Sequence, residues 1–245
     1  MWRSLQRWRG VVLVAAAVLA TAILWFNNQL VLYIHPRYIV FTVVMSGLAL
    51  VFVLASLLLR PAHDEQEHED AQLAPRRGSH ALSLAAAMIL LPPATLSSTT
   101  ATQRDITSTT VGAQTQSVSE ADAAPVASFA AFTVVDWASL LRQTSDLGFY
   151  AGKPVDVVGF VTADADDPQN VFYVSRFVVT CCAVDAQPTG IPVYLANWPD
   201  TLKADDWVRV TGEFAANPSA RSTQSVALKP NEVTAVEQPS EPYLY

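Results

Sequence analysis

The sequence predicts two kinds of structure in one chain, namely membrane-spanning helices in the first hundred residues and an all-β domain in the C-terminal half. Two long stretches near the N-terminus carry no charge, and an alternation of apolar and polar residues begins after residue 154. Only 15% of the 245 residues are charged, against about 25% in ordinary soluble domains. We therefore expect a membrane region over 1–96, a flexible linker over 97–128 and an extracytoplasmic β-domain over 129–245.

The first two apolar stretches have the length that crosses a bilayer. Residues 11–30 and 38–59 contain no Asp, Glu, Lys or Arg, and about 20 apolar residues span the hydrocarbon core. The short connection through Pro36 predicts a helical hairpin. The alternative for the first stretch is a cleaved signal peptide, with small residues at 20–22, but the apolar run continues through Phe26 and favours a membrane helix.

A third helix is predicted over 79–97. Its strongly apolar part, 81–91, is short for a span and precedes two prolines, so an interfacial or re-entrant helix is the alternative. The positive-inside rule places the N-terminus and the loop 60–78 in the cytoplasm, because arginines gather there: Arg3, Arg7, Arg9, Arg60, Arg76 and Arg77. Three spans of a multi-pass protein of the cell membrane would carry the C-terminal domain outside, whereas two would leave it in the cytoplasm.

Composition separates the linker from the β-domain. Residues 97–119 are more than half Ser and Thr, and such a segment buries too little apolar surface to offset its ordering entropy. The net charge of −7 lies within 129–245, where seven Lys and Arg accompany fourteen Asp and Glu. An acidic domain repels phosphate backbones, so we expect no nucleic-acid partner, whereas a cation or a basic protein surface would suit it.

The pattern after residue 128 predicts short strands and one short helix. Asp136 is expected to cap a helix over 137–144, and Gly159 and Gly212 inside strands suggest bulges or sharp bends. Such a pattern fits a small Greek-key barrel of the oligonucleotide/oligosaccharide-binding (OB) type, with a small open sandwich as the alternative. The predicted strands are 155–162, 171–180, 192–198 and 205–214, with two short runs at 225–229 and 232–236.

Several blocks of the chain resemble one family. The blocks are 152–161, 176–186 and 206–212, with the C-terminal tail 239–245, and the most specific element is Cys-Cys-x-x-Asp-Ala from Cys181 to Ala186. Together with the helical hairpin, they are similar to bacterial membrane proteins described as permease subunits, whose C-terminal domain has no assigned function. The resemblance covers nearly the whole chain. It implies a multi-span membrane permease as partner, besides the lipid bilayer, and it implies no reaction or substrate.

Cys181 and Cys182, followed by Asp185, have three interpretations. They could bind a divalent metal ion as cofactor, form a vicinal disulfide that an extracytoplasmic location would permit, or be small buried side chains of the core. Adjacent residues on a strand point to opposite faces, so both thiolates reach one ion only if the backbone turns there. The resemblance, and not this chemistry, favours the first two interpretations.

A second candidate metal site lies in the predicted cytoplasmic loop. His63 and His68 alternate with carboxylates, and His80 follows. Histidine and carboxylate side chains bind divalent ions, but a solvated loop has the same composition, and the spacing matches no defined site.

The residues favour a binding role over catalysis. No nucleophile elbow, phosphate-binding loop or His-Glu-x-x-His motif is present, and no histidine lies within the β-domain. We expect a non-catalytic accessory subunit of a membrane permease, with a tethered outer domain that binds substrate or metal ion. The alternatives are a membrane-anchored thiol–disulfide protein and a structural interaction module.

Overall fold

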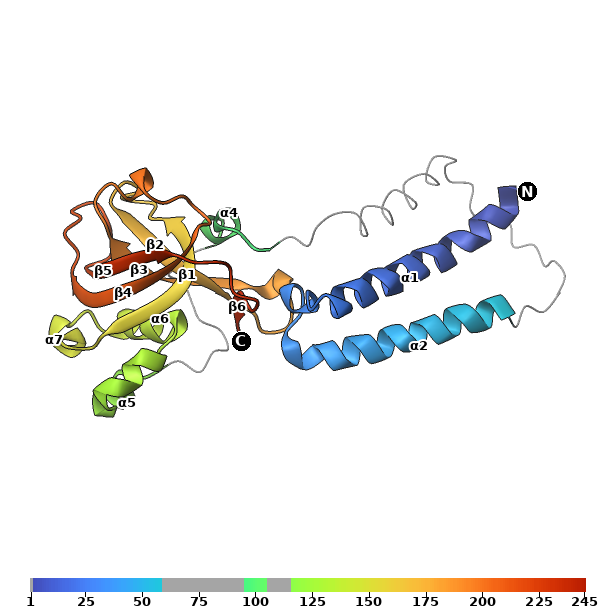
Figure 1. Ribbon diagram of the computed structural model, residues 1–245, viewed down its shortest axis with the longest axis horizontal. Helices are drawn as coiled ribbons and strands as arrows, with labels where there is room; N and C mark the ends of the chain where they lie inside the picture. Colours follow the sequence, from blue (N-terminus) through green and yellow to red (C-terminus); the bar gives the residue numbers. More distant parts are fainter. Residues whose placement is uncertain (1, 59–94, 105–115) are drawn as a thin grey trace. The chain divides into compact units, whose positions relative to one another are not determined.

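The computed structural model describes residues 2–58, 95–104 and 116–245, and the chain divides into two compact units, Met1–Ala94 and Thr95–Tyr245 (Figure 1). The predicted loop 60–78 and most of the predicted third helix lie outside the described residues. Residues 95–97, the end of that predicted helix, are not helical.

The N-terminal unit contains two helices that pack along each other, α1 (Trp2–Phe26) and α2 (Ile39–Leu58) (Figure 1). Two short 3-10 turns, η1 (Leu30–Leu32) and η2 (Pro36–Tyr38), connect them. The predicted first helix was too long at its C-terminal end, because the chain leaves the helix at the left-handed Asn28 (φ 55°). The second helix agrees with the predicted 38–59 to within one residue at each end.

Length and apolarity identify one candidate membrane span among the described residues, Pro36–Ala55. The apolar part of α1, Leu13–Phe26, is shorter. Of the three predicted membrane helices, one, the second, is long and apolar enough to count as a candidate span among the described residues.

The C-terminal unit is built on one mixed sheet of six strands (Figure 1). The strand order is β1-β4-β5-β3-β2-β6, and β1 also pairs with β2, so the first five strands close into a ring. The pairs β3–β5 and β2–β6 are parallel and the others antiparallel. The strands are β1 (Val155–Ala163), β2 (Val171–Val178), β3 (Gln187–Tyr194), β4 (Trp207–Ala216), β5 (Val226–Ala235) and β6 (Tyr243–Leu244).

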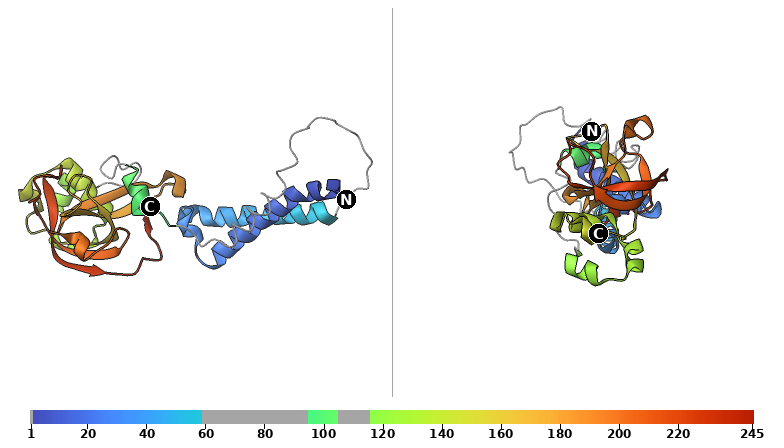
Figure 2. Two further views of the ribbon diagram at one scale, coloured as in Figure 1. Left: turned by 90° about the horizontal axis from the view of Figure 1, so that it is seen from above. Right: turned by 90° about the vertical axis from the view of Figure 1, so that its left-hand side faces the viewer.

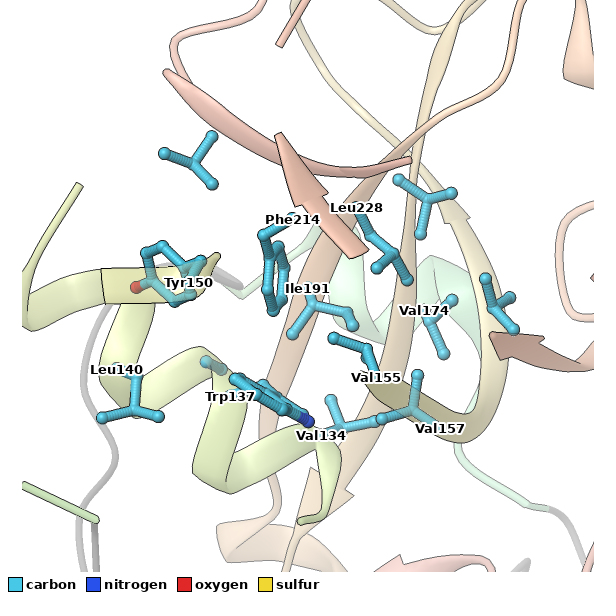
Figure 3. Close-up of a cluster of buried hydrophobic side chains, with 14 of the residues drawn as sticks. Val134, Trp137, Leu140, Tyr150, Val155, Val157, Val174, Ile191, Phe214 and Leu228 are labelled. Carbon is cyan, nitrogen blue, oxygen red and sulfur yellow. The ribbon is translucent and has the colours of Figure 1, made fainter. Parts of the chain in front are cut away.

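Apolar side chains from the strands and from two helices fill the interior of this unit. Helix α6 (Val134–Gln143) brings Trp137 against Phe214 of β4, with ring centroids 5.3 Å apart, and α7 (Leu147–Tyr150) adds Tyr150 on the same ring at 5.0 Å (Figure 3). Trp137 and Tyr150 are fully buried. The strands curve around this core, with α6 and α7 at one side of the sheet (Figure 2).

Several local predictions needed correction. The helix predicted over 137–144 begins at Val134, because Thr133 is the N-cap and Asp136 is the third helical residue that completes a capping box. The runs 225–229 and 232–236 are one strand, β5, whose register shifts opposite Gly212, where the bend was expected. Strand β3 begins at Gln187, five residues before the predicted start.

The described parts of the predicted flexible linker differ from that prediction. They contain α4 (Ser98–Thr102), α5 (Val118–Ala123) and the start of the 3-10 helix η3 (Val126–Ala131), and α4 and α5 bury Ala101 and Ala121 respectively. Average composition concealed this order, because single small apolar residues pack against the β-domain and a capping box of Ser117 and Glu120 starts α5.

Gly212 should be among the least replaceable residues of the sheet. A Cβ there would clash with the backbone carbonyl of Lys229 and lie 3.0 Å from Cα of Pro230 on β5. Gly212→Ala should therefore destabilise the domain by about 1–3 kcal/mol, because two backbones must move apart. Thermal unfolding followed by tryptophan fluorescence measures this, with Ala216→Ser at the exposed end of β4 as control. Equal midpoints for both variants would contradict the expected clash.

Candidate metal centre

The two cysteines lie in the loop that joins β2 to β3. Strand β2 ends at Val178, two residues earlier than predicted, and Cys182 is the N-cap of a 3-10 turn, η4 (Ala183–Asp185). The backbone therefore turns at the cysteines, which removes the strand geometry that would have separated them. Their Sγ atoms are 3.6 Å apart, and both are free thiols.

Asp185 holds this turn through its carboxylate. Its Oδ2 accepts a hydrogen bond from the backbone N–H of Cys181 at 2.8 Å. Its Oδ1 accepts from the N–H groups of Thr180 at 3.2 Å and Cys182 at 3.4 Å. Three donors on one carboxylate fix its position before any ligand arrives.

The charges of the loop act on one another. Asp185, which accepts a hydrogen bond from the thiol, and then Cys182 raise the pKa of Cys181 to about 12, because deprotonation would add a negative charge beside them. Burial alone would raise the pKa of Asp185, but hydrogen bonds from the Cys181 thiol and from the surrounding N–H groups outweigh it and lower that pKa. Asp185 is therefore ionised at neutral pH while Cys181 keeps its proton.

The three side chains form the kind of donor set that a metal ion takes. The Sγ atoms of Cys181 and Cys182 and a carboxylate oxygen of Asp185 all lie within 4.8 Å of one another. The buried-core interpretation of the cysteines was wrong, because Cys181 is exposed and Cys182 is half-buried. The loop thus presents two thiols and a carboxylate to solvent.

Sequence reasoning missed a neighbour of this loop, Arg104. Its guanidinium donates hydrogen bonds to the backbone carbonyls of Ala186 and, at 3.4 Å, of Val184. Arg104 is 82 residues from Ala186 in sequence and lies in a segment that composition alone assigned to a tether, so no sequence signal pointed to it.

The acidic loop between β1 and β2 has a structural role. Ser222 donates to Asp164 at 2.8 Å and Ser219 donates to Asp167 at 2.6 Å, which ties this loop to the β4–β5 loop. The hydrogen bond from Ser219 is the main cause that lowers the pKa of Asp167. Both carboxylates are buried and use their oxygens on protein donors.

The predicted site of His63, His68 and His80 lies outside the described residues. Within the described ranges, the three side chains whose ligand atoms lie close enough to share one ion are those of Cys181, Cys182 and Asp185.

Fold and site together define a class: a chain with a candidate membrane-spanning helix and a separate mixed-sheet domain that carries a thiol–carboxylate cluster. The chain belongs to the family described as the DUF1980 C-terminal domain, which matches residues 114–245. The whole cluster lies inside this match.

Other comparisons add little. No curated protein matches the chain. Two solved structures resemble part of it: "OBody AM2EP06 bound to hen egg-white lysozyme", at 27% identity over 36% of this chain and 82% of that chain, with a TM-score of 0.22, and "OBody AM3L09 bound to hen egg-white lysozyme", at 25% identity over 36% and 84%, with a TM-score of 0.23. TM-scores this low carry no argument about fold or function.

Proposed function

We propose that this chain is a non-catalytic accessory subunit of a bacterial membrane permease, and that its C-terminal domain binds a thiophilic divalent metal ion through Cys181, Cys182 and Asp185. The observation that carries the metal site is the convergence of these three donors within 4.8 Å. The site offers one ion three of the four ligands of a tetrahedral centre, which leaves one position for water or for a group from the partner.

The sulfur separation in the ion-free loop is compatible with a tetrahedral ion. Two thiolates bound to one Zn²⁺ at about 2.3 Å each are about 3.8 Å apart in a tetrahedral site, and about 4.6 Å apart if the three atoms are collinear. The observed 3.6 Å is close to the first value. Sulfur ligands also select Zn²⁺-like ions over Mg²⁺ or Ca²⁺, which prefer oxygen.

The electrostatics support the same assignment. The Cys181 thiol resists deprotonation because Asp185 and Cys182 stand beside it. A bound dication reverses this effect, because it neutralises the clustered negative charge and deprotonates coordinating thiols. The loop is thus an unfavourable place for a free thiolate and a favourable one for a thiolate on a metal.

The fold supports a binding domain rather than an enzyme. The strand ring β1-β4-β5-β3-β2, with β3 and β5 parallel, supports our assignment of an OB-type barrel. OB barrels bind ligands over the face of their second and third strands. The loop that joins β2 to β3 and carries Cys181, Cys182 and Asp185, which we name the metal loop, connects those two strands. An ion bound there would lie at the end of that face.

The membrane role remains a proposal about topology. The candidate span Pro36–Ala55 supports membrane association. We propose three spans, a cytoplasmic N-terminus and an extracytoplasmic C-terminal domain, following the distribution of arginines. Protease digestion of intact cells tests this, since an outside domain should be cut without lysis. Co-purification of a multi-span permease with the full chain tests the partner.

Metal binding is tested on the reduced full chain in detergent. Titration with Co²⁺ should give one ion per chain and a thiolate-to-cobalt charge-transfer absorption, which Zn²⁺ then abolishes by displacement. Mg²⁺ and Ca²⁺ should not compete. A chain that binds Co²⁺ without the charge-transfer absorption would exclude the cysteines as ligands.

The 3.6 Å sulfur separation also favours one second function, thiol–disulfide exchange between Cys181 and Cys182. The raised pKa argues against it, because the thiolate is the nucleophile. A pKa of about 12 in place of 9.0 lowers the thiolate fraction of Cys181 about a thousandfold, and the greater nucleophilicity of a more basic thiolate recovers only part of this.

We therefore expect alkylation of Cys181 by iodoacetamide at pH 7 to be roughly 30- to 60-fold slower than that of a free cysteine, although Cys181 is exposed. Mass spectrometry of the metal-free wild-type chain over time, with fragmentation that separates Cys181 from Cys182, gives the rate, with the same chain in denaturant as control. A rate at or above that of free cysteine would favour the redox function.

A further inference from the structure

Residues 95–104, the first described residues after the N-terminal unit, dock on the β-domain beside the metal loop. We name this stretch the strap. Its helix α4 buries Ala101 completely, in a small apolar cluster separate from the main core. The cluster also contains Val179 and Ala186, the two residues that flank the cysteine turn, together with Phe160, Phe177 and Tyr243.

Polar contacts secure the strap along its length. The backbone N–H of Leu96 donates to Oη of Tyr243 at 3.1 Å, and the N–H of Ser98 donates to Oδ1 of Asp205 at 2.5 Å. At the other end, Arg104 donates to the carbonyls of Val184 and Ala186. Those carbonyls belong to the residues before and after Asp185. The Arg104 guanidinium therefore holds the backbone on both sides of the proposed carboxylate ligand.

We propose that the strap is a positioning element of the metal site, so that ion affinity depends on strap docking and strap docking depends on the ion. This inference rests on the proposed metal function. Groups that orient metal ligands typically contribute 10- to 100-fold to metal affinity. Arg104 acts in this way through the backbone of Asp185 without touching the ion.

The position of the strap in the chain shows which other segment this coupling would reach. It lies outside the family match at 114–245 and begins within the last three residues of the segment predicted as the third membrane helix. An ion that tightens the loop also tightens the strap, because coupling between two binding events is reciprocal. Occupancy of the metal site would thereby order the chain that follows the predicted third helix.

Two different variants of the full chain in detergent test the coupling. Arg104→Ala removes the donors to the loop, and Ala101→Glu places a charge at a fully buried position and undocks the strap. Each should weaken Co²⁺ binding about tenfold. The double variant should be no weaker than the worse single variant, because both act through one docking event. Arg104→Lys should recover part of the affinity, since its ammonium also donates to carbonyls.

Matched controls separate positioning from charge and from folding. Arg221→Ala removes the same charge from an exposed residue in the β4–β5 loop, which contacts the β1–β2 loop at the other end of β2, and Ala216→Glu adds the same charge at an exposed alanine of β4. Both should keep the wild-type Co²⁺ affinity to within twofold. The main core contains no strap residue, because Ala101 and Leu96 belong to the separate small cluster. The test variants should therefore keep a cooperative unfolding transition.

Hydrogen exchange gives the reciprocal measurement. The amides of Leu96, Ser98 and Ala101 should exchange about tenfold more slowly in the ion-bound wild-type chain than in the ion-free chain, and the difference should vanish in Arg104→Ala. Unchanged Co²⁺ affinity in both test variants overturns the positioning role and leaves the metal function standing. A wild-type chain that binds no ion overturns the metal function itself.

Discussion

Replacing Cys181 and Cys182 together by serine should lower the Co²⁺ affinity of the full chain by at least about 100-fold and abolish the thiolate-to-cobalt absorption. The reason is that a serine hydroxyl stays protonated at neutral pH and cannot supply the anionic sulfur that binds Zn²⁺-like ions. Asp185 would remain as the single anionic ligand of the cluster. Titration of the reduced chain, followed by absorption and equilibrium dialysis, measures both changes.

Stability separates lost ligands from lost structure in this experiment. Cys181 is exposed and Cys182 is half-buried, so the double serine variant should unfold at nearly the wild-type temperature without metal. Asp185→Asn makes a useful contrast, because it removes one ligand and also weakens the hydrogen bonds that hold the turn. If the double serine variant bound Co²⁺ as tightly as the wild-type chain, Cys181 and Cys182 would not be ligands and the proposed metal site would be wrong.

The division of the chain and most of the strands were predictable because their signals are local. Alternation over β4 and the first part of β1 reflects burial of one strand face, whereas β2 is an almost continuous apolar run that is buried on both faces. The second apolar stretch carries no charge over the length of α2. Boundaries were less accurate where a single side chain decides them, as at Asn28 after α1 and Thr133 before α6. These are capping effects that a periodic pattern does not contain.

The metal site was partly predictable. The sequence identified Cys181, Cys182 and Asp185, but a strand continued to residue 180 would have turned the thiols apart. The turn that brings them together depends on Asp185 accepting three backbone N–H groups, which becomes evident only in three dimensions. The strap was missed because its docking depends on two single residues, the buried Ala101 and Arg104. The composition of a Ser- and Thr-rich segment does not reveal the contacts of individual residues.

Metal affinity should rise steeply with pH, by at least about 100-fold between pH 6 and pH 8. The pKa of Cys181 is raised to about 12 in the ion-free chain, so its thiol is protonated throughout this range. Binding as thiolate releases that proton, and each released proton makes the apparent affinity about tenfold higher per pH unit. The pKa of Asp185 is lowered, so its carboxylate is already ionised at pH 6 and adds nothing to the slope.

The slope itself identifies the groups that bind the ion. Competition titrations with Zn²⁺ at pH 6, 7 and 8 should give a line in log affinity against pH, and Cys181→Ser should reduce its slope by about one proton, because the proton of that thiol is no longer released. Asp185→Asn should weaken binding at every pH without lowering the slope, since asparagine has no proton to release in this range. An affinity independent of pH in the wild-type chain would mean that oxygen ligands hold the ion, and the thiols of the β2–β3 loop would then have no part in it.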